Sequence, residues 1–515
     1  MGEIFMSTTK VVLLAAAATL SVAPAFAQKA QDTLRIAINN PFAVLSNYDL
    51  PVDESSIFTR DVYDHLLYYD ERAQKYVPGL AKSWTRIDDT TIDYEIRDDI
   101  KFHNGDALDA SDIKATMDYA IDPKSKITFV ANYNWVKEVE QLGPYKLRVR
   151  SREVQSTDLA HMAYRFQIFD GKLLGKLQDR ADYGRLSPVG SGVYKVTQLD
   201  PNKGITVERY DGYNTTPERK KAGIKKIHGI PLPDRQTQAA QMMVGGVDLL
   251  RNVEPELAKA LSANPNIQTT YVPELNLFYF ALDSQNLSGN KALSDIRVRK
   301  AIHMGINADE IIKHIVPGGH VAEKLYADCF KATIACKYNV KPAAYDPEGA
   351  KKLLAEAGYP NGIDLHYVVY AANKNIGEAV AGELYKIGVR VTVQATDISL
   401  YRRMLSDGKL QAWSILYPTG LFPDASGIMN VLFTGPAMKY YNDPIIAQAT
   451  ADGVKEFDPA KRADIYAKAF DRINEMAYHF PLSSVPTVYV HTKDVAIKDN
   501  PFSAGQTFVS DYVWK

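Results

Sequence analysis

No glycine- or serine-rich linker and no low-complexity tract interrupts the 515 residues of this chain. A chain of this length exceeds what one hydrophobic core can hold, so it is expected to divide into two or three domains. Short strands with period-two patterning alternate with capped helices along the whole sequence. Mixed strands and helices without linkers predict an α/β protein whose lobes pack closely and are joined by more than one passage of the chain.

Turn and cap residues mark several of these elements. Residues 192–210 contain two strands joined by a Pro-Asn-Lys-Gly turn, and Asn104-Gly105 ends another alternating run with a hairpin signal. Asp346-Pro347 and Asp458-Pro459 are each typical of a helix start. Strands and helices therefore follow one another in both halves of the chain.

The N-terminus has the pattern of a secretory signal. Lys10 precedes an apolar run, and Ala25-Phe26-Ala27 forms an A-x-A cleavage site before Gln28. The apolar run is far shorter than the ~20 residues that a membrane-spanning helix needs. Residues 1–27 are thus predicted to be a signal peptide, and the mature protein is predicted to be exported to the periplasm.

Export bears on the two cysteines of the chain, Cys329 and Cys336. Six residues lie between them, and an oxidising compartment favours a local disulfide over free thiols. A metal site would need further ligands nearby, and the sequence offers none. We expect a Cys329–Cys336 disulfide, no metal site and no cofactor.

Composition and motifs give no support to nucleic-acid binding or catalysis. The formal net charge is −1, so no basic field favours nucleic acid or an anionic membrane. The sequence contains no G-x-S-x-G elbow, H-E-x-x-H pair, Walker A loop or G-x-G-x-x-G turn. A secreted hydrolase with an unfamiliar site remains an alternative without positive support.

Several stretches together resemble a known family. Residues 77–122 read VPGLAKSWTRIDDTTIDYEIRDDIKFHNGDALDASDIKATMDYAID, and PVGSGVYKV, VERYDGYN, GGVDLL, DIRVRKAIHMGINADEII, YDPEGAKKLLAEAGYPNG and ELYKIGVRVTVQATD follow. In order and spacing they are similar to the family 5 extracellular solute-binding proteins, the dipeptide and oligopeptide receptors of ABC importers. The resemblance covers essentially the whole mature chain.

The resemblance implies a periplasmic-binding-protein type II-like fold of cluster C, with two lobes and an extra inserted domain. Domain I would combine residues 28–70, 186–276 and 493–515, domain II would be the insertion 71–185, and domain III would span 277–492. A monomer would bind its ligand between the lobes and deliver it to an ABC permease in the inner membrane.

The ligand site is sought in residues 413–427, WSILYPTGLFPDASG, a run too rich in turn formers for a regular helix and too apolar for a solvated loop. Against the peptide receptors, Tyr417 falls on an aromatic position, and Gly420 or Leu421 falls where an Asp grips the peptide ammonium. Asp424 corresponds to a later acid. It either contacts ligand or caps the helix that follows.

Three aromatic positions complete the predicted site. Tyr370 falls near the place of an Arg that holds the ligand carboxylate in dipeptide receptors. Trp413 and Phe422, together with Tyr417, offer stacking faces, although any one of these rings is equally suited to a core. Both charge clamps of the peptide receptors are thus replaced by neutral residues in this chain.

These replacements leave the ligand class open. A peptide is the family default, and the missing clamps favour a non-peptide solute such as an opine-like or sugar conjugate. A sensor or chaperone with the same fold is a third possibility. An unpaired ammonium removed from water costs several kcal/mol, so a zwitterionic dipeptide would need other partners.

Overall fold

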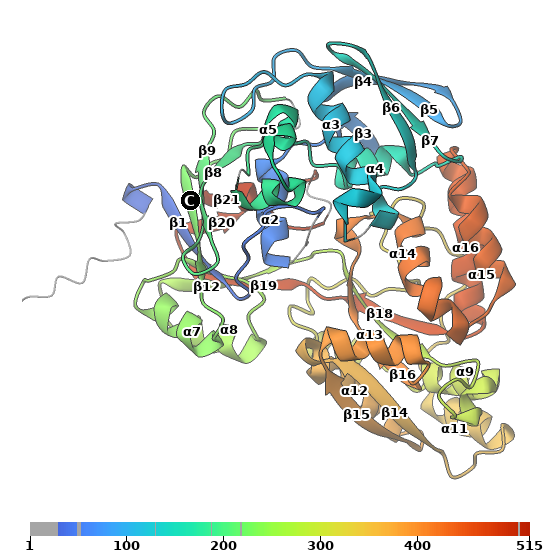
Figure 1. Ribbon diagram of the computed structural model, residues 1–515. Helices are drawn as coiled ribbons and strands as arrows, with labels where there is room; N and C mark the ends of the chain where they lie inside the picture. The colour runs from blue at the N-terminus through green and yellow to red at the C-terminus, as the bar shows by residue number, and fades with distance from the viewer. Residues whose placement is uncertain (1–28, 49–52, 129, 187, 217–218, 503–504) are drawn as a thin grey trace, which may run out of the picture.

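The computed structural model describes residues 29–48, 53–128, 130–186, 188–216, 219–502 and 505–515. The predicted signal peptide and its cleavage site lie outside these residues. The described chain folds into two lobes built on separate sheets, with helices around each (Figure 1). This mixed architecture confirms the α/β prediction.

The first lobe contains a seven-stranded sheet in the order β12-β19-β11-β1-β10-β9-β8. Its central strand β1 runs parallel to β10 and β11, and the outer pairs are antiparallel. The strands are β1 (Thr33–Ile38), β8 (Tyr194–Asp200), β9 (Gly204–Arg209), β10 (Lys226–Pro231), β11 (Leu249–Leu250), β12 (Ile267–Val272) and β19 (Thr487–Thr492). Its helices are α2 (Asp53–Val62), α7 (Arg235–Met243) and α8 (Pro255–Leu261), and β20 (Val495–Ile497) pairs with β21 (Tyr512–Trp514).

A four-stranded antiparallel sheet, β4-β5-β7-β6, extends the first lobe. It comprises β4 (Ala81–Asp88), β5 (Thr91–Ile96), β6 (Val136–Gly143) and β7 (Lys146–Ser151), and the hairpin β2 (Leu67–Asp70) and β3 (Lys75–Pro78) leads into it. The helices α3 (Ala110–Ile121), α4 (Asp158–Tyr164), α5 (Gly171–Lys176) and α6 (Tyr183–Leu186) accompany it. β5 lies between β4 and β7, so both of its edges are paired, and five of its six residues are buried.

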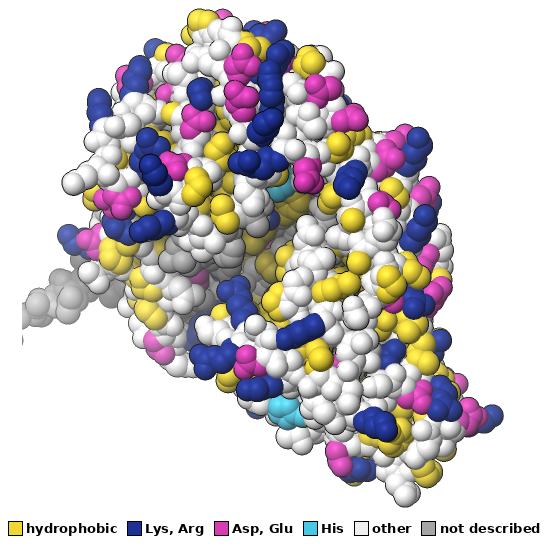
Figure 2. All heavy atoms as spheres, turned by 45° about the vertical axis from the view of Figure 1, so that its right-hand side comes forward, with side chains coloured by type: hydrophobic (Ala, Val, Ile, Leu, Met, Phe, Trp, Pro, Cys, Tyr) yellow, Lys and Arg dark blue, Asp and Glu magenta, His cyan; other side chains and the backbone are white. Residues whose placement is uncertain are grey.

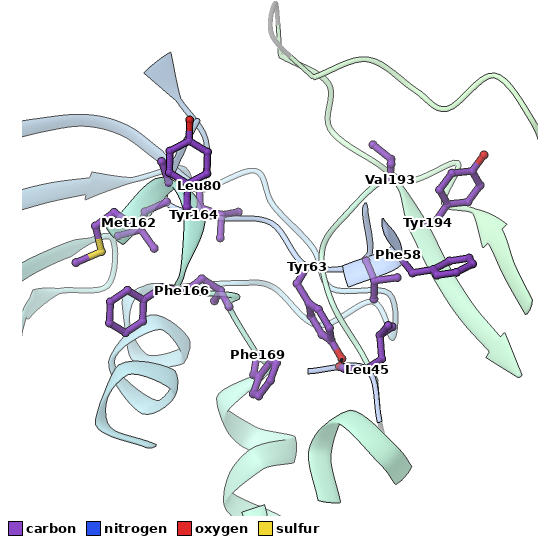
Figure 3. Close-up of a cluster of buried hydrophobic side chains, with 14 of the residues drawn as sticks. Leu45, Phe58, Tyr63, Leu80, Met162, Tyr164, Phe166, Phe169, Val193 and Tyr194 are labelled. Atoms are coloured by element: carbon purple, nitrogen blue, oxygen red, sulfur yellow. Dashed lines mark hydrogen bonds between the residues drawn. The ribbon is translucent and has the colours of Figure 1, made fainter. Parts of the chain in front are cut away.

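One hydrophobic core joins the two sheets of the first lobe. Figure 3 shows side chains from α2, α4 and the start of β8 within this core, which also contains Tyr63, Tyr164 and Phe169. Phe169 stacks on Tyr183 with ring centroids 4.1 Å apart. The four-stranded sheet is therefore anchored to the seven-stranded sheet through shared packing.

The second lobe is built on the sheet β15-β14-β16-β13-β17, in which β18 also pairs with β13. The strands are β13 (Asn276–Leu282), β14 (Ile363–Tyr370), β15 (Val389–Thr396), β16 (Ala412–Ser414), β17 (Leu416–Pro418) and β18 (His479–Ser484). The helices are α9 (Ile296–Met304), α10 (Ala308–His314), α11 (Pro347–Glu356), α12 (Lys374–Tyr385), α13 (Ile398–Asp407), α14 (Ala425–Leu432), α15 (Pro444–Gly453) and α16 (Pro459–Glu475). Asp346 and Asp458 cap α11 and α16, as predicted.

Two passages of chain connect the lobes, one from β12 to β13 and one from β18 to β19. Glu274 lies in the first passage, with its carboxylate buried. It accepts hydrogen bonds from Thr487 Oγ1 at 2.7 Å, at the start of β19 where the second passage ends, and from the backbone N–H of Thr507 at 3.1 Å. A single side chain thus ties both passages and the C-terminal segment together. The division into domains I, II and III stays a prediction.

Candidate functional site

The carboxyl ends of parallel strands place several polar residues at one edge of each sheet. In the first lobe, Asn39 and Asn40 follow β1, which is parallel to its neighbours β10 and β11. In the second lobe, β14, β15 and β16 are parallel, and β14 and β15 end at Tyr370 and Thr396. Ligands of open α/β sheets bind at such carboxyl edges. The face in Figure 2 is hollowed between the two lobes.

Residues 413–427 contain the end of β16, all of β17 and the start of α14. Tyr417 pairs with Leu277 of β13, and the N–H of Thr419 donates to the carbonyl of Leu275 at 2.8 Å. Leu275 belongs to the passage between the lobes. This run is therefore neither a regular helix nor a free loop, because its backbone is bound to the hinge.

Phe422, from the same run, packs into the core of the first lobe. Its ring centroid lies 4.9 Å from that of His161 and 6.3 Å from that of Tyr164, both on α4. The guanidinium of Arg165 lies 5.0 Å from the centre of the Phe422 ring. The apolar character of residues 413–427 follows from this contact with the opposite lobe.

Arg165 is the cation of this contact. It follows the last residue of α4, its side chain is half-buried, and its buried Nε has no hydrogen-bond partner. Burial lowers the pKa of its guanidinium, and the nearby hydroxyls of Tyr133 and Tyr417 act in the opposite direction. Among the described residues, no carboxylate oxygen lies within 4.0 Å of its charged nitrogens. The neighbouring Arg86, in contrast, binds Asp158 at 2.9 Å.

Both carboxylate oxygens of Asp424 accept hydrogen bonds from other groups of the protein. It caps α14 by accepting from the N–H of Ser426 at 2.8 Å and from its hydroxyl at 2.7 Å. Arg462 of α16 donates to both of its oxygens, at 2.7 and 2.6 Å, and the Asp424 side chain is only 1% exposed. Of the two roles considered for Asp424, this geometry is that of a cap within a buried ion pair.

The other predicted site residues differ in their exposure. Trp413 is 2% exposed in the core of the second lobe, 4.7 Å from the ring of Tyr440, and Gly420 is also buried. Tyr417 is half-buried, and burial raises the pKa of its hydroxyl to about 12. Leu421 is 40% exposed. Tyr370 is half-buried at the end of β14.

Polar atoms that the sequence did not single out lie at the same edge of the second lobe. Thr396 ends β15, Asn373 follows β14, and Thr419 follows β17. The Oγ1 atoms of both threonines and the Oδ1 atom of Asn373 are buried without a hydrogen-bond partner. Buried polar groups without partners are uncommon, so these atoms are suited to receive a ligand. Only the fold brings them together, since nothing in their local sequence marks them.

A second set of contacts links the two lobes beside Phe422. Ser156, just before α4, donates its N–H to the carbonyl of Val454 at 2.7 Å and its hydroxyl to that of Gly453 at 3.1 Å. The guanidinium of Arg86 lies 4.0 Å from the centre of the Phe457 ring. The extension of the first lobe therefore rests on the ends of α15 and α16.

The predicted disulfide is confirmed between Cys329 and Cys336. Within the closed ring, the N–H of Ile334 donates to the carbonyl of Pro423 at 2.8 Å, and the carbonyl of Ile334 accepts from the N–H of Ala425 at 2.9 Å. These two bonds flank Asp424. The disulfide ring thereby holds residues 423–425 through two backbone hydrogen bonds.

The described residues contain no cluster of three or more His, Cys, Asp or Glu side chains that would bind a metal ion. In the same part of the chain, no helix combines the length and apolarity needed to cross a bilayer. The geometry is that of two hinged lobes with polar groups at the facing edges of their sheets.

The family profile described as bacterial extracellular solute-binding proteins, family 5, matches residues 75–440. This chain belongs to that family. The glutathione-binding protein GsiB of Escherichia coli (strain K12) is 26% identical over 509 residues, which cover 94% of each chain. The receptor therefore has a full-length relative as well as a family assignment.

Solved structures share the fold of the receptor. NikA from Brucella suis, in complex with Fe(III)-EDTA, has a TM-score of 0.81 at 21% identity over 94% of this chain and all of its own. AgaA from Agrobacterium tumefaciens R10, in complex with agropinic acid, has a TM-score of 0.71 at 22% identity over 94% and 99%. These similarities confirm the periplasmic-binding-protein type II-like fold.

The family also fixes the general role of the chain. It is a periplasmic substrate-binding protein that captures a small solute and delivers it to the permease of an ABC importer. Members of this family are binding proteins, and the family is extracellular or periplasmic.

Proposed function

We propose that this receptor captures a solute that carries a carboxylate, and that Arg165 is the counter-ion of that carboxylate. The observation that carries the proposal is a half-buried guanidinium, between the two lobes, whose Nε is buried and which has no carboxylate partner among the described residues. A charge removed from water without a partner destabilises the protein by several kcal/mol. An anionic group of the ligand, arriving as the lobes close, offsets that cost.

The lack of a free acid in residues 413–427 supports the same ligand class. Asp424 is paired with Arg462, Gly420 is buried, and Leu421 has no charge to offer. An ammonium group therefore has no partner in this part of the second lobe. Tyr370, Tyr417, Thr396 and Asn373 offer neutral hydrogen-bonding and stacking groups, and we propose that they contact the body of the ligand.

Glutathione is the first candidate, because it carries two carboxylates and the relative GsiB is named for binding it. An opine-like acid conjugate is the second, and the absence of an acid at the Gly420 or Leu421 position favours it. Both candidates bear the carboxylate that Arg165 requires.

The family and the sequence also support proposals on processing, oligomeric state and the fate of the ligand. We propose that signal peptidase cuts before Gln28, that the mature receptor is a monomer, and that it returns its ligand chemically unchanged. The absence of a known nucleophile and base motif in the sequence supports the last point.

The test compares an acid with its ester in calorimetric titrations. The wild type should bind glutathione at least about 30-fold more tightly than glutathione diethyl ester, since losing one partner of a desolvated charge pair costs roughly 2–5 kcal/mol. Arg165→Met should reduce this ratio to about one by weakening only the acid. Arg180→Met removes an exposed arginine from the same lobe and should leave the ratio unchanged.

The stability of Arg165→Met gives a second readout. Replacing an unpaired buried charge with an apolar side chain should raise the melting temperature of the ligand-free protein. If Arg165→Met kept the preference for the acid, or if the wild type bound acid and ester equally, the proposal would be wrong.

A further inference from the structure

Glu54, in the first turn of α2, is a buried carboxylate with little to hold its charge. Its side chain is 7% exposed, and its hydrogen bonds within the described part of the chain are with Nδ2 of Asn40, at 3.2 Å to Oε1 and 3.3 Å to Oε2. Among the described residues, no Lys, Arg or His nitrogen lies within 4.0 Å of its oxygens. Two long hydrogen bonds from one neutral amide are weak compensation for a buried negative charge.

The buried carboxylates of Asp61, on α2, and of Asp64, two residues after α2, are held differently. Asp61 accepts from the N–H of Ser510 at 2.7 Å and lies 3.5 Å from Arg219. Asp64 accepts from the Tyr68 hydroxyl at 2.6 Å and lies 3.8 Å from the same guanidinium. Both therefore have a cation and a strong donor, and Glu54 has neither.

The place of Glu54 in the fold relates it to the ligand. Its partner Asn40 is exposed and follows β1 directly, at the carboxyl edge of the parallel strands of the first lobe. This is the edge at which open α/β sheets bind their ligands. The dipole of α2 favours a negative charge in its first turn, but this effect is equally available to an exposed carboxylate and does not require burial.

We propose that Glu54 binds an ammonium group of the ligand, so that the first lobe supplies the charge partner that residues 413–427 of the second lobe lack. The proposal rests on the proposed function, since it concerns the same site. It adds that the solute carries an amine as well as a carboxylate, with Glu54 facing the amine and Arg165 facing the carboxylate. Asn40 orients the Glu54 carboxylate through its amide.

The experiment separates the two charges of the ligand. Glutathione, N-acetyl-glutathione and glutathione diethyl ester are titrated into the wild type, Glu54→Gln and Glu256→Gln. Glu256 lies in the first turn of α8 and is exposed, so Glu256→Gln removes a carboxylate from the start of a helix without touching a buried site.

The wild type should bind glutathione at least tenfold more tightly than its N-acetyl form. Glu54→Gln should remove this difference by weakening only glutathione, and Glu256→Gln should preserve it. The comparison of ligands in the wild type needs no variant, so it remains decisive if Glu54→Gln folds poorly.

Equal binding of glutathione and N-acetyl-glutathione by the wild type would overturn the role of Glu54, and so would equal weakening of both ligands in Glu54→Gln. Failure of all three ligands to bind at millimolar concentration would also count against it. Loss of the preference for acid over ester would instead overturn the role of Arg165 and leave the amine comparison intact. The roles proposed for Glu54 and Arg165 can therefore be contradicted independently of each other.

Discussion

Asp424 and Arg462 form a buried, two-pronged ion pair, with Oδ2 2.7 Å from Nη1 and Oδ1 2.6 Å from Nη2. The pair joins the start of α14 to the first turns of α16, and Arg462 Nε also donates to the carbonyl of Gly453 at 2.9 Å. Because Gly453 accepts from Ser156 of the other lobe as well, the pair supports the surface on which the first lobe rests.

Arg462→Met should lower the free energy of unfolding by about 3–5 kcal/mol, because it leaves the Asp424 carboxylate buried without a cation. Urea denaturation measures the loss. Arg390→Met is the matched control, since Arg390 binds Asp364 at 2.6 Å at an exposed site, and it should change little. If Asp424→Asn abolished ligand binding without lowering stability, Asp424 would be a ligand contact instead.

Reduction of the disulfide should loosen residues 423–425, because Ile334 binds this segment on both sides of Asp424. The Cys329→Ser, Cys336→Ser variant should lose about 2–3 kcal/mol of stability for a ring of this size. It should also bind ligand more weakly than the oxidised protein. Intact mass after alkylation, with and without reductant, checks the bond, and two free thiols in the untreated protein would contradict it.

Tyr417→Ala should weaken ligand binding by about 1–3 kcal/mol if the ring is a buried anchor between the lobes. Tyr417→Phe should bind almost as well as the wild type, because the Tyr417 hydroxyl has only a 3.4 Å contact with the carbonyl of Gly427. Titration calorimetry on both variants separates the ring from the hydroxyl. Equal affinity of Tyr417→Ala and the wild type would remove Tyr417 from the site.

The contribution of Asp511 to the stability of the receptor should fall as pH rises from about 4 to about 7. Burial, with a further contribution from the Asp61 charge, raises the pKa of Asp511 to about 7, whereas an unfolded Asp titrates near ~4. Between these values Asp511 binds a proton in the folded state only, so its contribution to the free energy of unfolding declines with pH and levels off above the folded pKa. Asp511 also accepts from the N–H of Phe508 and from Asn500, so Asn is a conservative replacement.

Between pH 5 and 8, the change in the free energy of unfolding of Asp511→Asn should therefore lack a loss of about 2–3 kcal/mol that Asp511 contributes in the wild type. Urea denaturation at several pH values measures the difference. Asp499→Asn, at an 86% exposed side chain near the same segment, serves as the control. Parallel pH profiles for Asp511→Asn and the wild type would contradict the raised pKa.

Local chemistry determined the parts of the fold that the sequence predicted. Asp346 caps α11, Asp458 caps α16, and the strands around residues 200–204 pair as a hairpin, because each depends on neighbours a few residues away. The family resemblance supplied the two-lobed arrangement. The disulfide could be predicted from export and from the short spacing between Cys329 and Cys336.

The site could not be predicted in the same way. The partner of Asp424 lies 38 residues further along the chain, and Phe422 meets Arg165 only because the lobes pack together. Glu54 stands out because, in the part of the chain that the structure describes, no cationic nitrogen lies within 4.0 Å of its oxygens, a property that no local pattern carries. Aromatic residues of residues 413–427 were predicted as candidates, but only the fold distinguishes the core residue Trp413 from the half-buried Tyr417.

The most direct test of the account is the mass of the small molecule that the receptor retains when purified from its own periplasm. Denaturing the protein and measuring the released compound by accurate mass spectrometry identifies it without a choice of probes. The account predicts an amine-bearing carboxylic acid, retained by the wild type and absent from Arg165→Met purified in parallel. A neutral or purely cationic compound, or the same compound retained equally by Arg165→Met, would contradict it.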